Sequence, residues 1–184
     1  MRLFAAVLPP PAALAELNAA VGALPQNEAL RWTSEPGRHF TLAFMGEVRE
    51  ELLPELRVRL ERAADRTAPF GLRLHGAGHF GNRTLWVGAA GDIDGMRMLA
   101  ERADAAARRA GVAMEQHRRY TPHITVARAR ATVALRPYTE ALAAFEGTSW
   151  QVDELSLVRS NLPTSGVAGE RPRYEVVGAW PLRG

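Results

Sequence analysis

Apolar residues recur along this chain at two spacings, which predict two kinds of element. Alternating apolar positions indicate strands with one buried face, and apolar positions three or four residues apart indicate amphipathic helices. The alternating segments predict strands at 2–8, 39–45, 69–77, 83–90, 122–128, 150–159 and 173–180. The helical spacing predicts helices at 11–24, 50–66, 93–110 and 134–145. This mixture, with a Gly/Pro/Ser loop at 161–171, predicts an α+β protein.

The two halves of the chain resemble each other in the order of their elements. Each half has a strand with a His-x-Thr pattern, followed by a helix and then by a pair of strands. This order indicates internal duplication and two pseudo-symmetric lobes, each built from sheet and helices. No linker rich in Gly, Ser or Pro separates them, so we expect residues 1–184 to form a single two-lobed domain.

The first His-x-Thr strand, RHFTLAFMGE, carries polar residues that a plain core strand does not need. Its large apolar residues alternate and are expected in the core: Phe40, Leu42 and Phe44. His39 and Thr41 fall on the opposite face, about 7 Å apart along the strand. A single His-x-Thr is a weak motif, because a lone histidine on a half-buried strand is usually a plain polar residue.

The run TPHITVARAR repeats the pattern in the second half of the chain. Ile124 and Val126 are expected in the core, and His123 and Thr125 fall on the other face. If the two halves are related by a pseudo-two-fold axis, the two polar faces meet in one cleft. Two matching copies favour a functional interpretation over chance.

Two imidazoles in one cleft can divide a proton-transfer reaction between them. A neutral imidazole can take a proton from water or a hydroxyl, while a protonated one gives a proton to a leaving oxygen. The hydroxyls of Thr41 and Thr125 can donate to oxygens on which charge develops. Arg128, near the end of the second strand, can add a cation for a phosphate. These groups are the set that an in-line displacement at phosphorus requires.

Composition limits the remaining possibilities. The formal net charge is +3 and all 23 basic residues are arginine, which permits a polyanionic partner without requiring one. There is no cysteine, so disulfides and thiolate metal sites are excluded. No secretory signal is evident, and no apolar run approaches the roughly 20 residues of a membrane span. We expect a cytoplasmic protein that does not bind a membrane.

Other catalytic motifs do not occur. The chain has no HExxH, no G-x-S-x-G, no P-loop and no G-x-G-x-x-G, so we expect no metal and no cofactor. The histidines outside the repeat, His75, His79 and His117, are interpreted as ordinary polar residues. Trp32 and Trp86 are interpreted as packing residues rather than as platforms for bases.

The pair HFTL (39–42) and HITV (123–126) resembles the two H-x-T-x signatures of the 2H phosphoesterase superfamily. Further segments narrow the resemblance to the RNA 2′,3′-cyclic phosphodiesterases, historically called 2′-5′ RNA ligases. These segments are MRLFAAV, RWTSEPGRHFTLAFMGEV, TPHITVAR, VDELSLVRS and RYEVV. The resemblance runs nearly from end to end. It implies two lobes of mainly antiparallel sheet with outer helices around a central groove.

The resemblance also implies an activity and a role for each motif residue. The family hydrolyses 2′,3′-cyclic phosphates of RNA or nucleosides to 2′-phosphates without a metal. His39 would be the proton donor and His123 the proton acceptor, a division that spacing alone does not make. Thr41, Thr125 and Arg128 would bind the phosphate.

Three functions remain open from the sequence. The first is the cyclic phosphodiesterase, with RNA 3′ ends or nucleotides as partners. The second is an RNA ligase that joins a 2′,3′-cyclic phosphate to a 5′-hydroxyl, because the same residues serve both reactions. The third is a non-catalytic RNA-binding module, which the mild charge and 7% aromatic content disfavour. We expect a monomer.

Overall fold

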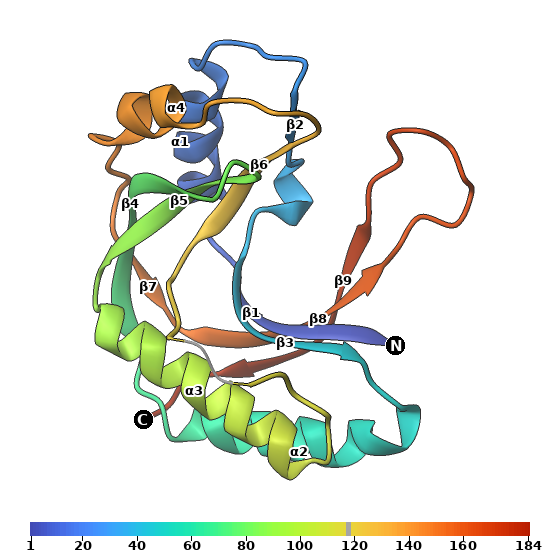
Figure 1. Ribbon diagram of the computed structural model, residues 1–184. Helices are drawn as coiled ribbons and strands as arrows, with labels where there is room; N and C mark the ends of the chain where they lie inside the picture. Colours follow the sequence, from blue (N-terminus) through green and yellow to red (C-terminus); the bar gives the residue numbers. More distant parts are fainter. Residues whose placement is uncertain (117–118) are drawn as a thin grey trace.

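The computed structural model describes residues 1–116 and 119–184 (Figure 1). Its strands are β1 (Arg2–Val7), β2 (Leu30–Trp32), β3 (Phe40–Glu47), β4 (Phe70–Phe80), β5 (Thr84–Gly91), β6 (Ile124–Ala129), β7 (Trp150–Val152), β8 (Glu154–Asn161) and β9 (Arg173–Pro181). Its α-helices are α1 (Pro11–Gly22), α2 (Leu53–Asp65), α3 (Ile93–Arg109) and α4 (Arg136–Leu142). Two short 3₁₀ helices are η1 (Glu35–Gly37) and η2 (Glu50–Leu52).

The strands form two antiparallel sheets, each with helices on its outer side. One sheet has four strands in the order β3-β1-β8-β9, and α2 and α3 pack against it. The other has five strands in the order β2-β6-β5-β4-β7, and α1 and α4 pack against it (Figure 1). The predicted α+β class with antiparallel sheets and outer helices is confirmed.

The two sheets do not correspond to the two halves of the sequence. The four-stranded sheet combines β1 and β3 with β8 and β9 from the end of the chain. The short strand β2, which the apolar pattern did not predict, joins the other sheet by pairing with β6. Each sheet therefore depends on contacts between segments that are distant in sequence.

The strand predicted at 150–159 is in fact two strands in different sheets. Val152 in β7 pairs with Phe70 in the five-stranded sheet, whereas Glu154 in β8 pairs with Pro181 in the four-stranded sheet. Asp153 is exposed between them. Because the apolar pattern reports burial and not the pairing partner, it runs through this crossing without a break.

Phe44 was predicted in the core, and this prediction is wrong. In the pairing of β1 with β3, Ala5 lies opposite Ala43 and Ala6 opposite Thr41, so Leu42 is an extra residue in β3 at this point of the ladder. Such a bulge interrupts the alternation of faces. Leu42 and Ala43 are therefore both buried, and Phe44 is 50% exposed.

Both motif strands rest on a shared core but differ in position. β3 is the edge strand of its sheet, whereas β6 lies between β2 and β5. A small second cluster of Phe4, Ala6 and Val158, with Tyr174 packed on it, covers the other face of β1. In the described part of the chain, no helix is both long and apolar enough to cross a membrane.

Candidate active site

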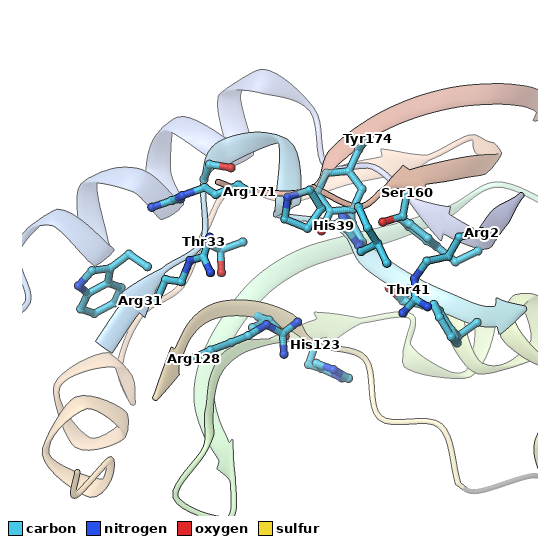
Figure 2. Close-up of a pocket in the computed structure, with 18 residues that line it drawn as sticks. Arg2, Arg31, Thr33, His39, Thr41, His123, Arg128, Ser160, Arg171 and Tyr174 are labelled. Carbon is cyan, nitrogen blue, oxygen red and sulfur yellow. The ribbon is translucent and has the colours of Figure 1, made fainter. Parts of the chain in front are cut away.

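A cavity of about 380 Å³ lies where the two motif strands face each other. Every site residue predicted from the sequence lines it: His39, Thr41, His123, Thr125 and Arg128. Figure 2 shows His39 on one wall, and His123 and Arg128 on the other. The two copies of the motif, which lie in different sheets, therefore contribute to one cavity.

His39 is the more buried of the two imidazoles. It stacks on Phe4 with ring centroids 4.6 Å apart and meets the edge of Tyr174 at 5.2 Å. Burial lowers the pKa of His39 to about 4, against the opposing effect of a hydrogen bond to the backbone of Pro36. The nearby charges of Arg128 and His123 lower this pKa further. His39 is therefore neutral at pH 7.

The backbone of Thr121 holds His123 in one orientation. Its Nδ1 lies 2.7 Å from the carbonyl oxygen of Thr121, which can only accept, so Nδ1 carries the proton. The Nε2 atom of the neutral ring is then free to accept a proton. Burial, and then the charge of Arg128, lower the pKa of His123, against the hydrogen bond to Thr121.

Two aromatic rings also support His123. Phe80 meets it nearly edge-on with centroids 4.9 Å apart, and Trp86 lies at 5.9 Å. Trp86 lies on Gly78, its partner in β4, where an added Cβ would come within 2.3 Å of the indole. Gly78 thus makes room for the ring behind His123. Trp86 is a packing residue, as predicted.

Arginines contribute the charge of the cavity. Arg128 lies opposite Arg31 in the pairing of β6 with β2, and both line the cavity together with Arg2 and Arg171. No Asp or Glu belongs to its lining in the described ranges. A cavity with this lining attracts an anion.

Several lining residues were not predicted from the sequence. Arg2, Phe4 and Tyr174 come from β1 and β9, which join the sheet of the first motif through strand pairing. Arg171 comes from the β8–β9 loop, which Arg31 contacts. No local motif marks these residues. Trp32, predicted to be a packing residue, lines the cavity and also packs on the core.

The remaining histidines do not extend this site. His75 and His79 lie on β4 and do not line the cavity. His117 lies outside the described residues. In the part of the chain that is described, no three His, Asp or Glu side chains are grouped so that they could hold a metal ion.

Two imidazoles and an arginine in one cavity define a site for acid–base chemistry on an anion, as in phosphoesterases. A model of the 2′-5′ RNA ligase superfamily matches residues 7–163, and the chain belongs to this superfamily. The resemblance inferred from the two motifs is thereby confirmed.

Named relatives agree with this assignment. The chain is 35% identical to an RNA 2′,3′-cyclic phosphodiesterase of Thermus thermophilus, over 100% of this chain and 91% of the relative. It is 32% identical to one of Geobacillus stearothermophilus, over 83% of this chain but only 48% of that longer relative. Among solved structures, Escherichia coli LigT complexed with 3′-AMP superposes with a TM-score of 0.75 at 28% identity, over 100% of this chain and 98% of that one.

Proposed function

We propose that this protein is a metal-independent phosphodiesterase that opens 2′,3′-cyclic phosphates of RNA or nucleosides to 2′-phosphates. The observation that carries the proposal is the meeting of both motif histidines and Arg128 in one cavity. The names of its relatives, and a LigT structure solved with 3′-AMP, support the same substrate chemistry.

In the proposed reaction, His123 acts as the base and His39 as the acid. Nε2 of His123 takes a proton from water as the water oxygen bonds to phosphorus. The bond from phosphorus to the 3′ oxygen breaks, and His39 gives that oxygen a proton. The product keeps the phosphate on the 2′ oxygen. The Nδ1 contact of His123 with Thr121 supports the base role, because it leaves Nε2 unprotonated.

The bound phosphate would raise the pKa of His39, which the acid role requires. His39 must be protonated to donate, although burial holds its pKa near 4. An anion bound beside the ring favours the imidazolium and raises this pKa. Arg128, Thr41 and Thr125, which line the same cavity, would bind the non-bridging oxygens.

The test is a direct assay of the reaction, with a chelator as the control for a metal requirement. The purified protein is incubated with adenosine 2′,3′-cyclic phosphate, with and without EDTA, and the products are separated by chromatography. We expect adenosine 2′-phosphate at the same rate in both samples. A 3′-phosphate product, or loss of activity with EDTA, would contradict the proposal.

Ligation uses the same residues, with a 5′-hydroxyl in place of water. A time course with a cyclic-phosphate oligonucleotide, with and without a 5′-hydroxyl partner, separates the two reactions. Binding without turnover of any cyclic phosphate would instead indicate an RNA-binding module. The proposal includes a monomer in the cytoplasm, and sedimentation of the purified chain checks the first part.

A further inference from the structure

The cavity holds more positive charge than the proposed reaction uses. A nucleoside 2′,3′-cyclic phosphate carries one negative charge, and Arg128 lies near enough to both histidines to lower their pKa values. Arg2, Arg31 and Arg171 line the same cavity, and no carboxylate among the described residues lines it with them. Guanidinium groups gathered without carboxylates repel one another, so this lining fits more than one anionic group.

The three additional arginines are not equivalent. The guanidinium of Arg2 lies over the ring of Phe44, 4.7 Å from its centroid. Arg31 donates from one nitrogen to the carbonyl oxygens of Gly169 and Glu170, at 3.2 and 3.0 Å. Arg171 is exposed and has no hydrogen bond or ion pair with any residue that the structure describes. Its planar fork is therefore free for a ligand.

The contacts of Arg31 place Arg171 at the cavity. Arg31 belongs to β2 of the five-stranded sheet, whereas Gly169 and Glu170 belong to the loop between β8 and β9 of the other sheet. The two hydrogen bonds thus attach this loop to β2 at the two residues directly before Arg171. The carboxylate of Glu170 accepts a hydrogen bond from Ser165 within the loop.

Arg128 and Arg171 also act on different groups. The charge of Arg128 lowers the pKa values of His39 and His123, whereas the charge of Arg171 lowers that of Arg38. Arg128 lies on β6 and Arg171 in the β8–β9 loop, so the two arginines line the cavity from different elements. A ligand with a second anionic group can contact both of them.

Resting on the proposed function, we propose that Arg171 binds the phosphate on the 5′ side of the terminal nucleoside. The 2′ and 3′ oxygens are both closed in the cyclic phosphate, so any further phosphate lies on that side. An RNA 3′ end would then make a contact with Arg171 that a free nucleoside cyclic phosphate does not make. Arg171 is a specificity determinant, and Arg31 is the residue that positions it.

Three substrates and an Arg171→Ala variant test this assignment. The substrates are adenosine 2′,3′-cyclic phosphate, its 5′-phosphorylated form, and the dinucleotide ApA with a 2′,3′-cyclic phosphate end. For the wild type, kcat/KM should be higher for the two substrates with a second phosphate. In Arg171→Ala this advantage should fall roughly ten- to a hundredfold, the size of a lost hydrogen bond to a charged group.

Matched variants separate a ligand contact from a structural effect. Arg173→Ala, an exposed arginine two residues on that does not line the cavity, should keep the wild-type ratio between substrates. Arg31→Ala should lower the ratio by a smaller factor, because the loop loses its attachment while Arg171 is still present. Arg171→Lys should retain part of the advantage.

Two results would overturn the inference. One is an equal loss on all three substrates in Arg171→Ala, which would place Arg171 at the reacting phosphate or in a structural role. The other is no loss on any of them. A wild-type protein that opens none of the three substrates would contradict the proposed function itself, so the two failures are distinguishable.

Discussion

His39 and His123 occupy the same place in two copies of one motif, yet their surroundings differ. His39 precedes an edge strand and is enclosed by Phe4 and Tyr174, and its pKa is about 4. His123 precedes an interior strand, and its Nδ1 is fixed by the Thr121 carbonyl. The two histidines of the same motif therefore differ in proton affinity, because different residues surround each ring. In the proposed reaction His39 is the acid, so a bound phosphate must first raise its pKa.

The largest expected effect is loss of turnover when either ring is removed. His39→Ala and His123→Ala should each lower kcat/KM roughly 10²- to 10⁴-fold, the usual contribution of a general acid or base. Bis(4-nitrophenyl) phosphate then separates the roles, because its leaving group needs no proton. His39→Ala should retain far more activity on this substrate than His123→Ala. If His123→Ala retains more activity than His39→Ala on this substrate, His123 is the acid and His39 the base.

The pH dependence of the wild type should follow from the low pKa of His39. The value of kcat/KM reports the free protein, in which His39 must be protonated and His123 neutral. With His39 near pKa 4 and His123 below its usual 6.5, kcat/KM should peak below pH 6.5 and fall as the pH rises. The optimum of kcat should lie at higher pH, since bound phosphate raises both pKa values. A kcat/KM optimum above pH 7 would contradict this assignment.

Stability should depend on pH through the same ring. His39 has a pKa of about 4 in the folded protein and 6.5 in the unfolded chain, so the unfolded chain binds more protons between these values. The free energy of unfolding should therefore fall as the pH drops from 6.5 to 4, by up to about 3 kcal/mol from His39. Urea unfolding of wild type and His39→Gln at pH 7 and pH 4 measures this, and the variant should lose less. Equal losses would show that burial does not perturb His39.

The smallest effects should come from the rings around each histidine. Phe80→Leu opens the surroundings of His123 and should raise its pKa by roughly a few tenths of a unit, without changing that of His39. Tyr174→Leu should raise the pKa of His39 by a similar amount, without changing that of His123. Proton NMR titration of the imidazole signals measures both values in each variant. A change in both pKa values in either variant would mean that the rings act on the fold and not locally.

Much of the fold could be predicted because buried positions recur in the sequence as apolar residues at regular spacing. The helices α1, α2 and α3 and most strands lie where the apolar spacing placed them. The errors share one cause, since the pattern reports burial and not pairing. The bulge beside Phe44 and the crossing at Asp153 are properties of the ladder between strands, which no local window contains.

The sequence by itself determined which residues are candidates for the chemistry. The two His-x-Thr repeats are recognisable because each is a short local pattern. The presence of two matching copies favours a functional role for both. Only the tertiary structure decided that the two copies share one cavity, how deeply each ring is buried, and that Arg31 fastens the loop carrying Arg171. These properties depend on contacts between segments far apart in the chain, and proton affinity and ligand reach are set by such contacts.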